Sequence, residues 1–508
     1  MCGIAGFCNF KEDFEENTDY WNFRLEKMRA VLAHRGNDAR GRYLKKHIGL
    51  SHSRLAIRDI LCGDQPMTRT HNGYEYTICY NGEIYNTDEL IPELSENGFV
   101  CSTTSDTEVI LYAYIHWGAD FVNRLNGIFA FAIWDAAKSR LLLYRDRVGV
   151  KPLFYAIRGD SLVFGSEPKA CFAHPAVKPE LDKQGLQELL AIGPAHTSGL
   201  SLFKDLFEVL PGHFMIYSRD GLHDETYWEL TSREHTESYR DTVAHTRFLV
   251  EDAIKRQMVS DVPVCTFLSG GIDSSIVTAI AANYMNTRGK TLNTFSFDFK
   301  DNDRYFKANA FQPERDLPYV NRMLEEYETA HAYLECDENS LFKALFAAVD
   351  AKDMPGMTDV DSSLLYFCSL VSRKNKVALT GECADEIFGG YPWFYRKELL
   401  ERYGFPWSSD VAPRLALLRD DVGLELDLSG YQAFRYEESR SKAPLLYGEA
   451  GEDESRRIIG YLNIKWFMQT LLDRMDRTSM YSELEARVPF ADHRICLLYT
   501  SPSPRDVE

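Results

Sequence analysis

The first half of the chain carries short apolar runs with the length and spacing of β-strands. Four such runs, each bounded by turn residues, occupy residues 47–52, 76–80, 129–134 and 141–144. Strands that are buried or half buried give this pattern. A helical pattern over residues 107–117 follows Ser105 and Asp106, which are typical helix-capping residues. The pattern predicts a β-rich layered domain with helices against it.

The second half combines helical spacing with continuous apolar strands. Val243, Val250 and Ile254 recur at intervals of seven and four residues, which predicts a helix. Apolar strands are expected at residues 262–268, 292–296 and 376–380, and another helix at residues 276–285. Residues 218–238 are polar, so we place a linker there, between domains at residues 2–217 and 239–495.

Composition narrows the functional classes. A chain of 508 residues is expected to form two or three domains, and 45% hydrophobic with 26% charged residues is typical of a soluble globular protein. A net charge of -19 argues against binding to nucleic acid or to an anionic membrane. There is no apolar run of membrane-spanning length and no signal peptide. The 11 cysteines form no CxxC pair, which favours a reduced, cytoplasmic protein.

Cys2 stands where removal of the initiator methionine would leave it as the first residue. A terminal cysteine carries a thiol and a free α-amine, with ordinary pKa values near ~8.5 and ~8. The amine could then act as the base for the thiol. The alternative is that Cys2 is simply a second residue without a special role.

Asn81 and Gly82 follow a predicted strand. A side-chain amide beside a glycine N–H offers two donors for an oxyanion, and glycine lets the backbone approach closely. An Asn-Gly pair is also an ordinary turn sequence.

A glycine- and serine-rich turn, Ser269-Gly270-Gly271-Ile272-Asp273-Ser274-Ser275, joins a predicted strand to a predicted helix. This arrangement places N–H groups and a helix N-terminus around a phosphate. Asp273 would repel a phosphate unless a cation lies between them, which suggests Mg²⁺. The turn lacks the GxxxxGK[ST] pattern of a Walker A loop. A serine-rich helix cap is the alternative.

A second strand ends in Gly381-Glu382-Cys383-Ala384-Asp385-Glu386. Carboxylates just beyond a strand, at the carboxyl edge of a parallel sheet, lie where such folds bind ligands. Solvated acidic loop residues are the alternative.

Several N-terminal motifs together resemble the class II glutamine amidotransferases. They are Cys2-Gly3-Ile4, His34-Arg35-Gly36, Ser53-Arg54-Leu55-Ala56-Ile57, Asn81-Gly82-Glu83-Ile84-Tyr85-Asn86, Ser105-Asp106-Thr107-Glu108 and Arg145-Asp146-Arg147-Val148-Gly149. The resemblance implies an N-terminal-nucleophile hydrolase fold, an αββα sandwich. It also implies that Cys2 attacks glutamine while Asn81 and Gly82 hold the oxyanion. Arg54, Ile57, Glu83 and Asp106 would bind glutamine. One departure is Asn37, where the family usually has proline.

The second half resembles the PP-loop ATP pyrophosphatase domain of asparagine synthetases, a doubly wound parallel sheet. The resemblance implies an ATP site at Leu268, Ser269, Gly270, Gly271, Asp273, Ser274, Phe297, Thr380, Gly381 and Arg477. It implies that Glu382 contacts the reacting aspartyl-adenylate and that Asp273 and Asp385 bind Mg²⁺. Asp361-Ser362-Ser363 and Glu485-Ala486-Arg487-Val488-Pro489-Phe490 fit the same family. Cys383 stands where the family usually has glycine.

The implied reaction is ATP-dependent synthesis of L-asparagine from L-aspartate, with L-glutamine as the ammonia donor. It would pass through β-aspartyl-AMP and release AMP and pyrophosphate. Because ammonia must stay neutral to react, a dry passage between the domains is expected. A homodimer is compatible with the sequence, which does not determine the oligomeric state.

Three alternatives share parts of this plan. Another amidotransferase would pair the first half with a sugar-phosphate domain, and a β-lactam synthetase-like ligase would act on a different carboxylate. The third, a truncated glutaminase or glutamine-binding protein, rests on residues 496–508, which resemble nothing in the family. Pro502 and Pro504 cannot continue a helix there, and we expect a truncated reading frame.

Overall fold

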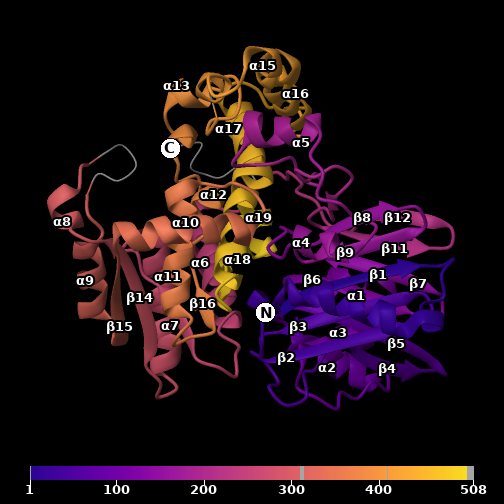
Figure 1. Cartoon of the computed structure of the whole chain (residues 1–508). Helices are drawn as coiled ribbons and strands as arrows, with labels where there is room; N and C mark the ends of the chain where they lie inside the picture. The colour runs from indigo at the N-terminus through magenta and orange to yellow at the C-terminus, as the bar shows by residue number, and fades with distance from the viewer. Residues whose placement is uncertain (1, 309–313, 409, 500–508) are drawn as a thin grey trace.

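A computed structural model describes residues 2–308, 314–408 and 410–499. The chain forms two halves that lie side by side, the first dominated by antiparallel strands and the second by helices around a parallel sheet (Figure 1). A helical column stands between them.

The first half contains two six-stranded antiparallel sheets. One has the order β10 (Phe207–Glu208), β8 (Phe154–Arg158), β9 (Ser161–Gly165), β1 (Cys2–Asn9), β3 (Ile48–Arg54) and β2 (Ala39–Lys45). The other has the order β12 (Gly221–Thr226), β11 (His213–Ser218), β7 (Arg140–Arg145), β6 (Gly127–Asp135), β5 (Tyr74–Ile84) and β4 (Met67–His71). The strands predicted from the four apolar runs are therefore confirmed as β3, β5, β6 and β7.

Side chains from both sheets interdigitate in one core, in which Ile4 and Leu50 of the first sheet meet Ala132 and Leu143 of the second. Helices α1 (Thr18–Ala30) and α4 (Pro168–Phe172) cover the outer face of the first sheet. Helices α2 (Thr87–Glu96) and α3 (Asp106–Trp117) cover the second sheet. Ser105 caps α3, as expected, by accepting a hydrogen bond from the N–H of Thr107. This is the predicted αββα sandwich.

The second half is built on a five-stranded parallel sheet, as predicted. Its order is β15 (Thr329–Cys336), β14 (Leu292–Phe299), β13 (Val264–Phe267), β16 (Val377–Leu379) and β17 (Glu485–Arg487). Helices α6 (Tyr239–Arg256) and α7 (Ile272–Asn286) pack on one face, and α11 (Thr358–Val371) packs on the other. The sheet is therefore doubly wound.

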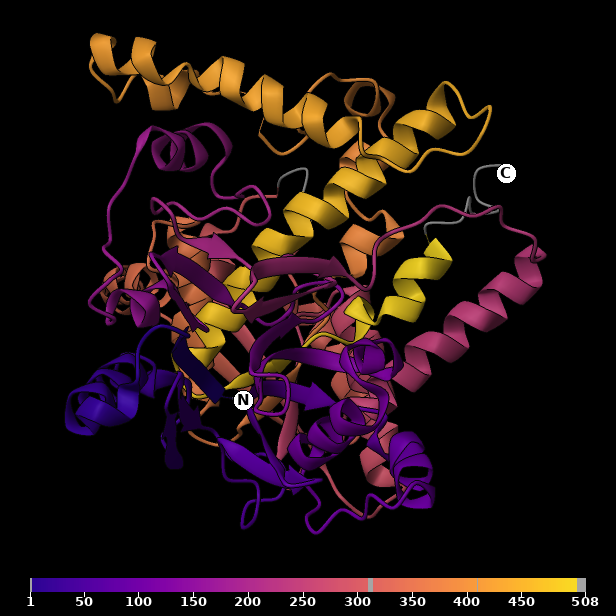
Figure 2. The ribbon, with the colours of Figure 1, turned by 90° about the vertical axis from the view of Figure 1, so that its right-hand side faces the viewer.

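The helical column consists of α17 (Glu452–Leu462), a π-helical turn (Asn463–Phe467) and α18 (Met468–Met480), which follow one another without a break (Figure 2). The remaining helices are α5 (Lys183–Gln187), α8 (Asn302–Tyr305), α9 (Leu317–Glu326), α10 (Glu338–Lys352), α12 (Ala384–Phe388), α13 (Lys397–Leu400), α14 (Ala412–Leu415), α15 (Asp420–Leu426), α16 (Leu428–Arg440) and α19 (His493–Tyr499).

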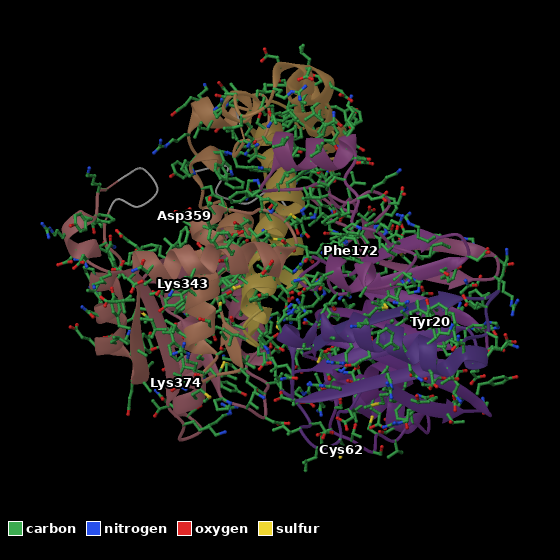
Figure 3. All side chains as sticks on the ribbon, viewed as in Figure 1. Tyr20, Cys62, Phe172, Lys343, Asp359 and Lys374 are labelled. Carbon is green, nitrogen blue, oxygen red and sulfur yellow. The ribbon has the colours of Figure 1, made fainter. Side chains whose placement is uncertain are left out.

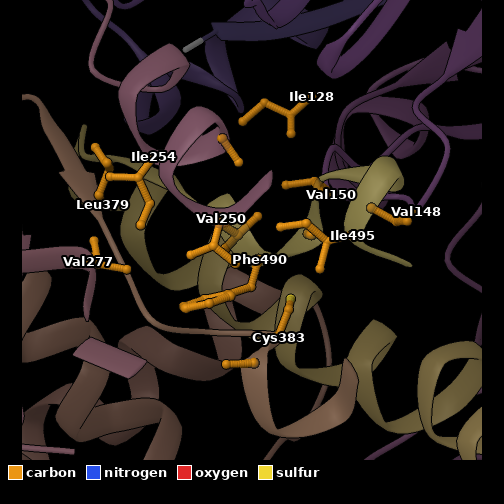
Figure 4. Close-up of a cluster of buried hydrophobic side chains, with 14 of the residues drawn as sticks. Ile128, Val148, Val150, Val250, Ile254, Val277, Leu379, Cys383, Phe490 and Ile495 are labelled. Atoms are coloured by element: carbon orange, nitrogen blue, oxygen red, sulfur yellow. The ribbon is translucent and has the colours of Figure 1, made fainter. Parts of the chain in front are cut away.

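An apolar core crosses from one half to the other. Ile128, Val148 and Val150 of the first half pack in one cluster with Phe490 and Ile495 of the second (Figure 4). Burial of this apolar surface holds the halves in a fixed relation.

Two expectations need correction. Arg219-Asp220-Gly221 closes the hairpin between β11 and β12, so the second sheet continues beyond residue 217 into the predicted linker. Asp-Gly is a turn sequence, and its polarity resembles that of a linker. The helix predicted from Val243, Val250 and Ile254 is confirmed as α6, on which Val243 is 50% exposed.

The predicted ending at residue 495 is the second expectation that needs correction. Helix α19 continues to Tyr499, and Cys496 is buried. The apolar residues 496–499 favour the helix, while Pro502 and Pro504 lie outside the described residues. Within the described ranges, none of the helices combines the length and apolar character needed to cross a membrane.

Leu50→Ala tests the sandwich core. Leu50 is fully buried between the sheets, so the substitution is expected to lower the free energy of unfolding by about 2–5 kcal/mol. The matched control is Leu61→Ala, where the side chain is 89% exposed and the change should stay within about 0.5 kcal/mol. Urea unfolding followed by fluorescence gives both values, and equal losses would contradict the layer assignment.

Candidate active site

Cys2 lies at the start of β1, a central strand of the first sheet, opposite Arg54 of β3. Its N–H donates to Oδ1 of Asn81 at 2.9 Å, and its carbonyl accepts from Nε of Arg35 at 3.2 Å. Burial raises the pKa of the Cys2 thiol, while the Leu55 N–H and the Arg54 guanidinium lower it. The net direction is upward, so the thiol needs a base to become a nucleophile.

The two predicted oxyanion donors lie beside Cys2. Nδ2 of Asn81 is buried and has no hydrogen-bond partner among the described residues, whereas Oδ1 is held by Cys2. Gly82 has a φ of +157°, and a Cβ there would come within 2.2 Å of the Ile128 carbonyl oxygen. The backbone at this point therefore requires glycine, and Asn81 keeps an unused donor.

One pocket joins most of the residues predicted to bind glutamine: Cys2, Arg54, Ile57, Gly82, Glu83 and Asp106. Arg54 donates to the carbonyl of Asp59 at 2.5 Å and to Oδ1 of Asp64 at 3.0 Å. Asp106 accepts from the Tyr80 hydroxyl at 2.9 Å and from the Ile84 N–H at 3.0 Å. The pocket thus offers a cationic end and an anionic end, which suits an amino acid.

Sequence analysis missed two arginines that hold Glu83. Arg58 donates to Oε1 of Glu83 at 2.9 Å, and Arg487 of β17 donates to Oε2 at 3.1 Å. Burial and the neighbouring Asp106 raise the pKa of Glu83, and the two guanidiniums counteract this rise. Arg58 adjoins the predicted Ser53–Ile57 motif, but no sequence pattern places Arg487 against this pocket.

The second site lies between β13 and α7, at the turn that the sequence assigned to phosphate. The hydroxyl of Ser269 lies 3.0 Å from that of Ser274, which also donates to the Gly271 carbonyl at 3.1 Å. Gly271 is the N-cap residue of α7, whose first N–H groups have no partner within the helix. Partial positive charge at this end favours an anion.

The loop after β16 approaches this turn closely. A Cβ on Gly381 would lie 2.9 Å from the Ser274 nitrogen and 3.0 Å from Cβ of Asp273. Thr380 is fixed by its N–H, which donates to the Arg487 carbonyl at 3.0 Å. The structure therefore brings Thr380 and Gly381 to the predicted ATP site.

Carboxylates gather where the two loops meet. Burial and nearby Asp385 raise the pKa of Asp273 to about 6, and burial with nearby Glu382 raises that of Asp385. Burial also raises the pKa of Glu386 to about 7. Within the described ranges, no three His, Cys, Asp or Glu side chains form a ready-made metal cage.

Of the other residues predicted to bind ATP, Leu268 and Phe297 lie near the turn, whereas Arg477 lies between the two halves. Leu268 directly precedes the turn, and its carbonyl accepts from the Ser296 hydroxyl at 2.5 Å. Phe297 follows Ser296 on β14. Arg477 is buried between the halves, where it donates to the Ala351 carbonyl at 2.9 Å. The arginine that reaches Glu382 is Arg474, one helical turn earlier, at 3.1 Å.

Cys383 adopts a φ of +76°, in the left-handed region that glycine favours. Its side chain is buried in the apolar core between the halves. The chain therefore keeps the backbone shape expected of a glycine at this position, with a thiol packed beneath it.

Comparison with known proteins agrees with both sites. Residues 1–228 match the family described as glutamine amidotransferase domain, and residues 245–503 match asparagine synthase. The chain is 48% identical to asparagine synthetase [glutamine-hydrolyzing] 3 of Bacillus subtilis, over 97% of this chain and 80% of that protein. It is 32% identical to putative asparagine synthetase [glutamine-hydrolyzing] 2 of Methanocaldococcus jannaschii, over 77% of this chain and 76% of that protein.

A further relative is amidase chyE of Penicillium rubens, at 32% identity over 81% of this chain and 62% of that protein. The match over the second half argues against a sugar-phosphate partner domain. The chain belongs to the family of glutamine-hydrolysing asparagine synthetases.

Proposed function

We propose that this chain makes L-asparagine from L-aspartate and ATP, with L-glutamine as the nitrogen donor, through β-aspartyl-AMP. The observation that carries the proposal is the pairing of two sites in one chain. A thiol with an unused amide donor lies in one half, and a phosphate-binding turn with carboxylates beside it lies in the other.

In the first half, the Cys2 sulfur attacks the side-chain carbonyl of glutamine. The α-amine freed by methionine removal takes the thiol proton and delivers it to the departing ammonia. Nδ2 of Asn81 and the Gly82 N–H stabilise the oxyanion, and water then hydrolyses the thioester to glutamate. Arg54 binds the α-carboxylate of glutamine, and Glu83 and Asp106 bind its α-ammonium.

In the second half, the β-carboxylate of aspartate attacks the α-phosphorus of ATP, and pyrophosphate leaves. The turn from Ser269 to Ser274 holds the phosphates, and Phe297 lies beside the adenine. Glu382, held by Arg474, faces the aspartyl-adenylate. Ammonia attacks the acyl carbon, and AMP departs. Positioning supplies most of the rate enhancement in such chemistry.

Asp273 and Asp385 fit a Mg²⁺ ion. Asp385 lies close enough to raise the pKa of Asp273, and a cation between two such carboxylates stabilises their ionised forms. Mg²⁺ usually binds one or two carboxylates and completes its shell with phosphates and water, so a larger protein cage is not needed. When bound, the ion neutralises charge on the phosphates.

The apolar core between the halves supports a dry route for ammonia. Ile128 and Val150 on one side and Leu379 and Val488 on the other belong to the same cluster. An apolar lining disfavours the charged ammonium ion, so ammonia stays nucleophilic in transit.

Cys2→Ala tests the first half. The variant is expected to lose glutamine-dependent asparagine formation, because the pocket described here offers no second thiol. Synthesis from ammonium salts should continue at the wild-type rate. Asparagine and pyrophosphate are measured with aspartate, ATP and Mg²⁺ under both nitrogen sources.

The matched control is Cys62→Ala, because the Cys62 side chain is exposed at the lower edge of the molecule (Figure 3). It should retain both activities. Glutamine-dependent synthesis by Cys2→Ala would sink the assignment of the nucleophile, and absence of aspartate-dependent pyrophosphate release by the wild type would sink the proposed ligase.

The raised pKa of Asp273, about 6, predicts a pH dependence of ATP binding. The carboxyl binds a cation only when ionised, so affinity is full well above pH 6 and declines as the pH falls through 6. Binding of ATP with Mg²⁺, measured by calorimetry, should weaken by about tenfold from pH 8 to pH 5. Asp273→Asn should bind weakly at both values, and an unchanged pH dependence in this variant would refute the assignment.

A further inference from the structure

A short segment before β13, residues 257–261, reaches from the second half to the glutamine pocket. The N–H of Asp261 donates to the Ile57 carbonyl at 3.0 Å, and Oδ2 of Asp261 accepts from the Asp59 N–H at 2.8 Å. The two bonds run in opposite directions between the same two loops. Asp261 is thus bound to the first half by its main chain and by its side chain.

Asp59 joins the two ends of the pocket. Its carbonyl accepts from Nη2 of Arg54 at 2.5 Å, at the cationic end. Its side chain accepts from the Thr104 N–H at 2.8 Å, directly before Ser105 and Asp106 at the anionic end. A shift of Asp59 would therefore move both ends at once.

The backbone of Asp59 does not hold this conformation by itself. Its φ is +46°, in the left-handed region, which costs a residue with a side chain of order 1 kcal/mol or more. Such a conformation persists only where its surroundings fix it. The Cys62 N–H, which donates to Oδ1 of Asp59 at 2.9 Å, supplies one restraint from the same loop. The bond from the Asp59 N–H to Asp261 is the restraint that comes from the other half.

The segment that carries Asp261 is itself anchored. Nη1 of Arg487 donates to the carbonyls of Gln257 and Val259, each at 2.6 Å, while Nη2 of the same guanidinium reaches Glu83. Two separate groups of the second half therefore hold the glutamine pocket, Asp261 at the Asp59 loop and Arg487 at Glu83. Three residues after Asp261, β13 begins and leads to the phosphate-binding turn.

We propose that Asp261 is a positioning residue of the glutamine site, supplied by the synthetase half. By accepting the Asp59 N–H, it keeps Asp59 in the strained conformation that presents Arg54 and Asp106 to glutamine at the same time. The proposal rests on the proposed function only in naming glutamine as the ligand of this pocket. The proposed role of Asp261 is in substrate binding. The reaction at Cys2 is carried out by the groups described above.

The test compares Asp261→Ala with Asp261→Asn in the full-length enzyme. Alanine removes the acceptor that the structure gives the Asp59 N–H, whereas the Asn side-chain oxygen can still accept it. Loss of one such bond should raise the KM for glutamine by roughly tenfold, with kcat for glutamate release within about twofold of wild type. Asp261→Asn should restore the KM to near the wild-type value.

Ammonium-dependent asparagine formation, measured on each variant, shows whether the second half is intact. It should be unchanged in Asp261→Ala. Asp220→Ala, an exposed aspartate in the β11–β12 turn, is the matched control and should keep the wild-type KM. If Asp261→Ala does not give folded protein, Asp261→Ser replaces it, because a serine side chain is too short to reach Asp59.

A wild-type KM in the folded Ala or Ser variant overturns the proposal. So does a KM in Asp261→Asn as high as that of Asp261→Ala, or a parallel loss of ammonium-dependent synthesis, which marks a merely structural role. Failure of the wild type to form asparagine from ammonium would instead refute the proposed function, and glutamate release would still decide the role of Asp261.

Discussion

The Arg487 guanidinium is fully buried between the two halves, and a buried charge is tolerated only where partners surround it. Glu485 and Glu83 supply the opposite charges, and the carbonyls of Gln257 and Val259 supply the remaining acceptors. Breaking any of these contacts would leave a charge unpaired in a low-dielectric region. The position of β17 against the first half is therefore fixed, and with it the position of the parallel sheet.

The consequences of this constraint reach both sites. The Arg487 carbonyl holds Thr380 at the predicted ATP site, and its guanidinium holds Glu83 in the glutamine pocket. A second buried ion network supports the same register, in which Arg35 of the first half pairs with Asp476 of α18 at 2.8 Å. Arg35 also donates to the Cys2 carbonyl, so the helical column contacts the strand that carries the nucleophile. Such paired charges specify geometry more than they add stability.

Between these polar contacts the interface is apolar, and the two kinds of contact have different roles. The apolar cluster around Ile128, Val150 and Phe490 excludes water and supplies most of the attraction between the halves. The ion pairs determine how the halves are oriented. The proposed passage of neutral ammonia from one site to the other requires a dry route and a fixed distance between the sites, and the two kinds of contact fit these two requirements.

Local sequence determined much of this protein. Alternating strands, the cap at Ser105 and the glycine-rich turn before α7 form from interactions within a few residues, so they could be predicted from pattern alone. The motifs around Cys2, Arg54, Asn81 and Asp106 also predict a shared pocket. In the structure Cys2, Arg54 and Asp106 line this pocket, while Asn81 is outside the lining and accepts a hydrogen bond from the Cys2 N–H.

Only the tertiary structure decided which distant groups complete the sites. Asp261 and Arg487 reach the glutamine pocket across hundreds of residues, and Arg474 donates to Glu382. No local periodicity encodes such contacts, because they depend on how the two halves of the chain pack. The polar sequence at Asp220-Gly221 predicts a linker for the same reason, since only pairing with β11 shows that this strand belongs to the sheet. Sequence determined the chemistry each half carries, and packing of the halves determined the geometry in which the two sites meet.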